Sequence, residues 1–95
     1  MIVRIVKMSF REEEILSFLE IFEKQKVFIA SFDGCSHLEL LKDKNRANVF
    51  FTYSHWENEA ALERYRESDF FRNIWSGVKE KFDAKPEAWS LAKHS

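Results

Sequence analysis

Apolar side chains recur along the chain with two different periods, and each period predicts a type of element. Residues 2–8, IVRIVKM, are apolar at most positions, which predicts a strand with both faces buried. Residues 11–30 place apolar side chains at helical spacing opposite a face rich in Glu and Lys, which predicts an amphipathic helix. Residues 35–42, CSHLELLK, alternate in the manner of a second strand.

Capping and breaking residues predict where these elements start and end. Ser9 followed by Glu12 has the spacing of a capping box at the start of the first helix. Gly34 is placed to end that helix, because glycine tolerates the left-handed dihedral angles that follow a C-cap. Pro86 is expected to stop the last helix, since proline cannot continue one.

The remaining elements are organised around residues 50–71, FFTYSHWENEAALERYRESDFF. Aromatic and β-branched residues predict a third strand that ends at Trp56 and Glu57. Asn58 then starts a helix, and Ser68 offers a second N-cap that breaks it in two. After the break, one apolar stripe is formed by Phe71, Ile74, Trp75, Val78 and Phe82. Residues 88–92 predict a short final strand.

The resulting order is βαββαβ, which predicts a single α+β domain over residues 1–95. Its fold is the ferredoxin-like arrangement with an antiparallel four-stranded sheet. Helices can cover only one face of this sheet, yet the first and third strands carry apolar side chains on both faces. We therefore expect a homodimer in which a second copy covers the open face, with more than about 2,000 Å² buried.

Composition and charge exclude several function classes. Fifteen basic and sixteen acidic side chains give a net charge of −1, so nothing draws the chain to nucleic acid or to an anionic membrane surface. No apolar run approaches the roughly 20 residues of a membrane span. The single Cys35 has no internal disulfide partner, which favours a cytoplasmic location. There is no phosphate-binding glycine loop and no histidine spacing typical of a metal site.

The segment 50–71 resembles the antibiotic biosynthesis monooxygenase superfamily. The resemblance rests on the motif Trp56-Glu57-x-x-Ala60-x-Leu62-x-x-Tyr65-x-x-Ser68-x-x-Phe71 and on the turn Phe32-Asp33-Gly34-Cys35 before the second strand. It implies a dimeric α+β barrel that oxygenates phenolic or quinol substrates without metal or flavin. Some members of this superfamily instead isomerise small molecules or have no assigned activity.

A haem-degrading branch of the superfamily is similar over the same segment. That branch carries an iron-binding His on the last helix, a Trp one helical segment earlier and an Asn on the first strand. The corresponding positions here hold Trp75, Tyr65 and Val6. Tryptophan offers no lone pair to iron, so the resemblance does not extend to haem degradation, and we expect no haem, flavin or metal cofactor.

The candidate site is an aromatic pocket for a small quinol-like ligand, between the sheet and the helices. Cofactor-free oxygenation requires groups that deprotonate a phenol and stabilise its anion. The candidate catalytic residues are His37, Tyr53 and Tyr65. The candidate substrate-binding residues are Arg4, Glu39, His55, Arg72 and Trp75. Each also has a structural interpretation, since Tyr and Trp commonly fill a core with their polar end hydrogen-bonded.

Three functions remain open from the sequence. The first is a cofactor-independent monooxygenase that acts on a small phenolic or quinol compound. The second is a dimeric barrel that binds a small ligand without turning it over. The third is a small-metabolite isomerase, in which His37 and Glu39 on one strand face shuttle a proton.

Overall fold

The computed structural model describes all residues, 1–95, and confirms the α+β ferredoxin-like order. Its elements are β1 Ile2–Ser9, a short 3-10 helix η1 Glu12–Glu14, α1 Ile15–Ala30, β2 Cys35–Lys42, β3 Val49–Trp56, α2 Glu59–Glu67, α3 Asp69–Lys79 and β4 Glu87–Ala92. None of its helices is both long enough and apolar enough to cross a membrane.

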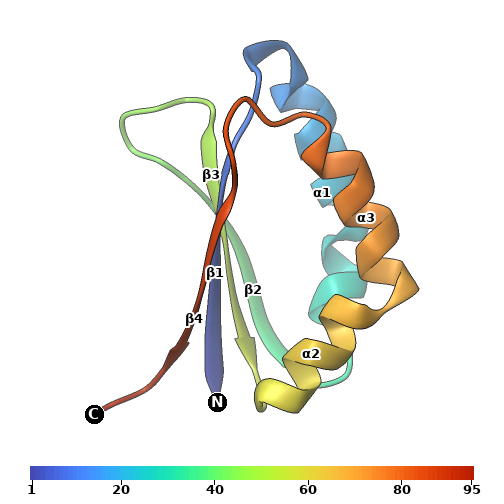
Figure 1. The fold of residues 1–95 in the computed structure, drawn as a ribbon, viewed down its shortest axis with the longest axis vertical. Coiled ribbons are helices and arrows are strands. Elements are labelled where there is room, and N and C mark those ends of the chain that lie inside the picture. The colour runs from blue at the N-terminus through green and yellow to red at the C-terminus, as the bar shows by residue number, and fades with distance from the viewer.

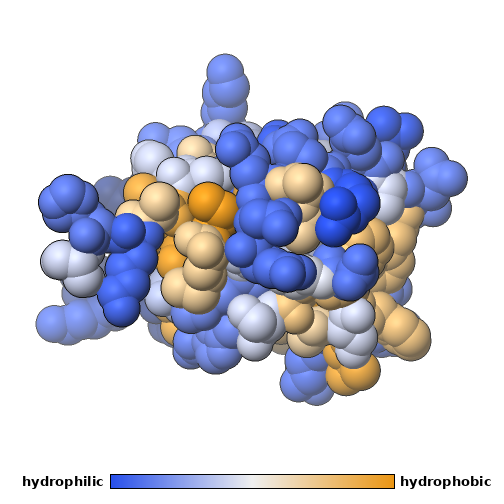
Figure 2. Space-filling view, turned by 90° about the horizontal axis from the view of Figure 1, so that it is seen from below, coloured by the Kyte–Doolittle hydropathy of each residue, from blue (hydrophilic) through white to orange (hydrophobic).

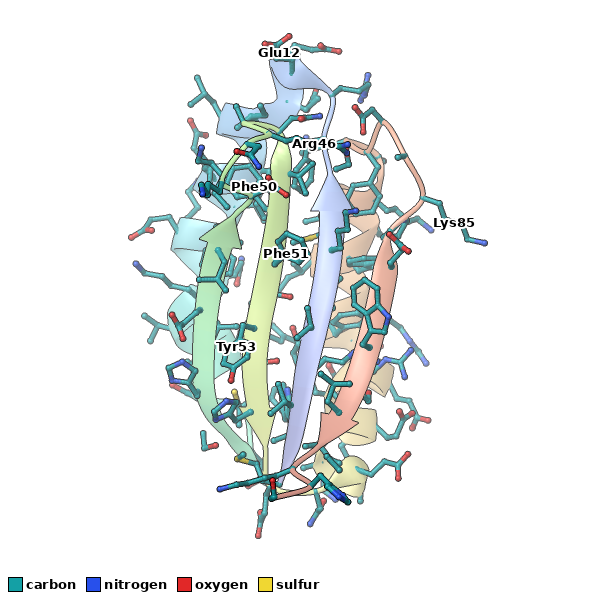
Figure 3. All side chains as sticks on the ribbon, turned by 90° about the vertical axis from the view of Figure 1, so that its left-hand side faces the viewer. Glu12, Arg46, Phe50, Phe51, Tyr53 and Lys85 are labelled. Carbon is teal, nitrogen blue, oxygen red and sulfur yellow. The ribbon has the colours of Figure 1, made fainter.

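The four strands form one antiparallel sheet in the order β2-β3-β1-β4. All three α-helices lie against the same face of this sheet, and both chain termini lie at the same end of the molecule (Figure 1). The other face carries no helix and is seen directly in Figure 3. The molecule therefore has a helix face, which can enclose a site, and an open face.

Strand register assigns every side chain of the sheet to one of these faces. On the helix face, one row across the sheet consists of Leu38, Ser54, Arg4 and Ser90. On the open face, the neighbouring rows consist of His37, His55, Val3 and Leu91, and of Glu39, Tyr53, Ile5 and Trp89. Because side chains alternate along a strand, adjacent residues of one strand belong to opposite faces.

The core lies between the helix face and the helices, in two clusters. The larger is built around Phe10, whose ring stacks on that of Phe18 at a centroid distance of 4.2 Å. The smaller contains Trp56, Ala61 and Leu62, all at most 3% exposed. The indole Nε1 of Trp56 donates to Ser54 Oγ at 3.0 Å, so the most buried tryptophan is also hydrogen-bonded.

Two N-caps break the second helical region as predicted. The Asn58 side chain accepts from the backbone N–H of Ala61 at 2.9 Å, and the Ser68 hydroxyl accepts from that of Phe71 at 3.1 Å. Ser68 has extended dihedral angles and ends α2 while it starts α3. Each cap satisfies an N–H that the first turn of a helix leaves unpaired.

The turn before β2 packs closely against the start of α2. Gly34 has φ of 90°, the left-handed region that favours glycine. A Cβ at this position would lie 2.4 Å from the Cβ of Ala61, and the Gly34 carbonyl accepts from the N–H of Glu57 at 2.7 Å. Gly34 therefore allows α2 to approach the sheet closely.

Three predicted element ends are wrong. Gly34 does not end the first helix, because α1 ends at Ala30 with Ser31 as its C-cap and Gly34 belongs to the turn before β2. Ser9 does not form a capping box with Glu12, because it is the last residue of β1 and its hydroxyl donates to Asp83. Pro86 does not stop α3, which already ends at Lys79. A connecting segment intervenes, in which Phe82 pairs with Phe10 as an isolated β-bridge.

Candidate functional site

A pocket of about 280 Å³ lies between the helix face of the sheet and the helices. It is lined by 20 residues, 14 of them hydrophobic. The helices contribute Phe18 and Phe22 from α1, Leu62, Tyr65 and Arg66 from α2, and Phe71, Ile74, Trp75 and Val78 from α3. The strands contribute, among others, Arg4, Val6, Thr52, Ser54 and Trp56. Pockets for drug-sized ligands occupy roughly 300–1,000 Å³, so this one suits a ligand of one or two rings.

Aromatic rings of α2 and α3 form one wall of the pocket. Tyr65 stacks on Trp56 at a centroid distance of 4.8 Å and meets Phe71 edge-on at 5.0 Å. Phe71 in turn stacks against Trp75 at 5.8 Å. This continuous aromatic surface suits a planar ring, because offset-stacked and edge-to-face contacts between rings are both favourable.

Tyr65 contributes a polar group to this wall. Burial, with a smaller contribution from Cys35, raises the pKa of its hydroxyl well above the ordinary value. Tyr65 is therefore a protonated phenol at neutral pH. It can donate a hydrogen bond to a bound oxyanion, but it cannot act as a general base.

Arg4 places a positive charge on the sheet side of the pocket. It lies on β1 between Ser54 of β3 and Ser90 of β4, and its Nη1 donates to Ser90 Oγ at 2.9 Å. Its guanidinium forms no salt bridge. Burial, followed by the nearby charge of Arg66, lowers the pKa of Arg4, and Glu63 offsets part of this effect. The cation is thus partly desolvated without a direct counter-ion.

Arg66 borders the same pocket from α2, and sequence reasoning missed it. Its Nη1 lies 2.9 Å from Glu63 Oε1, and more than two-fifths of each side chain is exposed. A signal was present, since Arg66 follows Leu62 by four residues and therefore shares its inward helix face. Thr52 and Ser54 were also missed, although both lie on the strand face that carries Trp56.

Of the predicted site residues, three border the pocket: Arg4, Tyr65 and Trp75. Val6, which was compared with the Asn of the haem-degrading branch, borders it too. Arg72 does not, because it lies on the exposed side of α3.

The other four predicted residues do not reach the pocket, which corrects the expectation of one shared site. His37, Glu39, Tyr53 and His55 all lie on the open face, where Figure 3 shows Tyr53 on β3. His37 Nε2 and Glu39 Oε1 are 2.6 Å apart, and His55 Nε2 and the Tyr53 hydroxyl are 3.0 Å apart. The physical reason is strand alternation: Trp56 and Ser54 occupy the helix face, so Tyr53 and His55 must occupy the opposite one.

Metal and haem ligands can be assessed from the donor groups present. No group of three or more His, Cys, Asp or Glu side chains is arranged to hold a metal ion. No histidine borders the pocket, and Trp75 has no lone pair for iron. The polar residues that line the pocket are Thr52, Ser54, Tyr65, Arg4, Arg66 and Glu87, beside its aromatic and aliphatic surface.

Solved structures share this fold over nearly the whole chain. A conserved protein from Methanosarcina mazei Go1 superposes with a TM-score of 0.91 at 19% identity, over 98% of this chain and 93% of that one. A protein named antibiotic biosynthesis monooxygenase gives a TM-score of 0.93 at 15% identity, with 100% of both chains covered. A variant of SnoaB, a cofactor-independent oxygenase from Streptomyces nogalater, gives 0.86 at 14% identity, over 99% of this chain and 93% of that one.

At these identities the superpositions establish the fold alone. Among curated proteins, no sequence matches this chain. Residues 1–75 match the family profile described as antibiotic biosynthesis monooxygenase. This match extends from β1 into α3 and includes Arg4, Tyr65, Arg66 and Trp75. The chain therefore belongs to the antibiotic biosynthesis monooxygenase family.

Proposed function

We propose that the protein is a cofactor-independent monooxygenase that acts on a small phenolic or quinol substrate in the pocket on the helix face. The observation that carries this proposal is the combination of an aromatic wall with two groups suited to an oxyanion. These groups are the protonated Tyr65 hydroxyl and the Arg4 guanidinium. Family membership supports the same reaction class.

In this reaction the substrate itself supplies the two electrons that reduce the second oxygen atom of O₂ to water. A phenol with a free ring position reacts with O₂ so that one oxygen atom forms the new quinone carbonyl and the other leaves as water. The reactive form is the phenolate, and a positive charge nearby lowers the pKa of a bound phenol. Arg4 supplies this charge, and Tyr65 donates a hydrogen bond to the phenolate oxygen.

No imidazole lines the pocket, and the carboxylates at or near it, those of Glu87 and Glu63, each lie beside a cation, so no side chain there is assigned as a general base. Glu63 is ion-paired with Arg66, and the Glu87 carboxylate lies 3.7 Å from Lys7 Nζ. The proposed mechanism therefore binds the substrate as its anion and does not assign a catalytic base. Trp75 contributes ring stacking to substrate binding.

Oxygen consumption with a panel of quinols tests this proposal. In Tyr65→Phe, turnover should fall at least about tenfold, near 1.4 kcal/mol of barrier, while the melting temperature changes little. Tyr53→Phe is the matched control, because it removes the same hydroxyl from the open face. Oxygen consumption no faster than without protein, across the panel, would refute the proposal, as would equal turnover in wild type and Tyr65→Phe.

A ligand-binding barrel without turnover is the second candidate, and the largely apolar lining of the pocket favours it. In that case aromatic ligands should quench the fluorescence of Trp56 and Trp75, both of which border the pocket, without any oxygen consumption. The isomerase hypothesis has no such support, because His37 and Glu39 lie outside the pocket.

We also propose that the protein works as a homodimer that covers the open face, in the cytoplasm. Leu41, Trp89 and Leu91 are 44%, 42% and 47% exposed there, although large apolar side chains favour burial. Figure 2, viewed from the end where the termini lie, shows hydrophobic residues exposed among hydrophilic ones. Cys35 is a free thiol, which is compatible with a reducing compartment.

A further inference from the structure

We infer that the pocket holds its ligand by a carboxylate bound between Arg4 and Arg66, and that the phenolic substrate therefore carries a carboxylate group on its aromatic body. This inference rests on the proposed function, since it names the substrate class of the same pocket. Three features of the pocket lead to it: a guanidinium without a protein counter-ion, a second guanidinium nearby and a largely apolar surface.

The first feature is the hydrogen bonding of Arg4. A guanidinium carries five N–H donors in a planar fork, and in Arg4 one of them reaches Ser90 Oγ at 2.9 Å. No carboxylate of the protein pairs with this cation, although it is partly withdrawn from water. A ligand carboxylate would satisfy the fork with two parallel hydrogen bonds, which is the arrangement that favours Arg over Lys.

The second feature is the convergence of two like charges on one pocket. Arg66 borders the pocket from α2, and its positive charge contributes, after burial, to lowering the pKa of Arg4. Glu63 is ion-paired with Arg66 at 2.9 Å and makes no salt bridge to Arg4. The carboxylates nearby are engaged elsewhere, Glu63 with Arg66 and the lining Glu87 with Lys7, so a bound anion would relieve the repulsion between the two guanidinium groups.

The third feature is the character of the remaining surface. Aromatic and aliphatic side chains supply 14 of the 20 lining residues, so the body of the ligand must be apolar. An apolar body with an anionic end describes an aromatic carboxylate. The pocket volume of about 280 Å³ limits that body to one or two rings. The phenolic oxygen of such a substrate is left to the Tyr65 hydroxyl.

Binding measurements with a matched pair of probes test this inference without requiring turnover. Naphthalene-2-carboxylate carries the anion, and naphthalene-2-carboxamide has nearly the same shape without the charge. Calorimetry or tryptophan fluorescence at neutral pH should show the acid binding at least about tenfold more tightly than the amide. Equal affinity for the two probes would overturn the inference.

Charge variants locate the subsite. Arg4→Gln and Arg66→Gln should each weaken the acid and leave the amide unchanged, with the larger effect, about tenfold, for the less exposed Arg4. Glu63→Gln should tighten acid binding, because it removes the competing carboxylate. Arg72→Gln is the control, since it changes the net charge equally at an exposed position outside the pocket.

These variants also distinguish failure of the carboxylate inference from failure of the monooxygenase proposal. If Arg4→Gln does not fold, Glu63→Gln and Arg66→Gln still give effects of opposite sign, and the absence of either effect would contradict the inference. An equal loss of affinity in Arg72→Gln would show long-range attraction in place of a defined subsite. Tight, arginine-dependent acid binding without oxygen consumption would refute the monooxygenase proposal alone. Turnover of neutral quinols with no preference for acids would refute this inference alone.

Discussion

Gly34→Ala is the substitution whose effect follows most directly from the geometry. The new Cβ would lie 2.4 Å from the Cβ of Ala61, a residue with no solvent exposure at the start of α2. It would also force alanine into φ of 90°. The first effect is overpacking, at about 1–3 kcal/mol, and the second is left-handed strain, at about 1–2 kcal/mol.

Together these terms predict a loss of about 3 kcal/mol in the free energy of unfolding. For a domain of this size, each kcal/mol corresponds to roughly 4–8 °C, so the melting temperature should fall by about 12–24 °C. Urea denaturation and a thermal scan, both at one protein concentration, measure the two quantities. Fixed concentration matters because any association would contribute to the apparent stability.

Gly77→Ala is the matched control for this experiment. Gly77 lies within α3, and a Cβ there would meet no atom within 4 Å. Its replacement should therefore stabilise the protein by up to about 1 kcal/mol through helix propensity alone. A Gly34→Ala protein within about 0.5 kcal/mol of wild type would refute the reasoning. Equal destabilisation by the two substitutions would refute it as well.

Two further predictions concern the site and the open face. The raised pKa of Tyr65 adds stability that is fully present below the unfolded-state pKa of 10.0 and is lost as pH rises through the folded-state pKa. The free energy of unfolding should therefore fall less steeply with alkaline pH in Tyr65→Phe than in wild type. Identical pH profiles of this free energy in the two proteins would contradict the prediction. Replacing Trp89 by Glu on the open face should convert a micromolar dimer into a monomer in sedimentation, whereas Phe28→Glu, on α1, should not; a wild-type protein that is already a folded monomer would remove the dimer proposal.

The sequence by itself determined the elements and their order. Alternation in residues 35–42 predicted β2 with its observed bounds, and Asn58 and Ser68 predicted both N-caps of the broken helix. These features depend on neighbours in the chain, so local patterns specify them. The motif around Trp56 and Tyr65 led to the family for the same reason, because its residues build one strand-to-helix connection.

Only the tertiary structure decided which strand face borders the pocket. The pattern in β3 shows that Tyr53 and His55 share a face, but aromatic residues occupy both faces of this strand, so either one could have received the helices. The packing of Trp56 and Phe50 against the helices resolves that choice and excludes His37, Tyr53 and His55 from the pocket.

The tertiary structure alone also decided that Arg4 and Arg66 border the same pocket. These residues are distant in the chain, and although each has a local signal that it faces inward, no local pattern brings the two together. They border one pocket only when α2 is packed against the helix face of the sheet, with Gly34 allowing its close approach. Local sequence specifies which face of each element is polar or apolar, whereas packing between elements determines which polar groups meet.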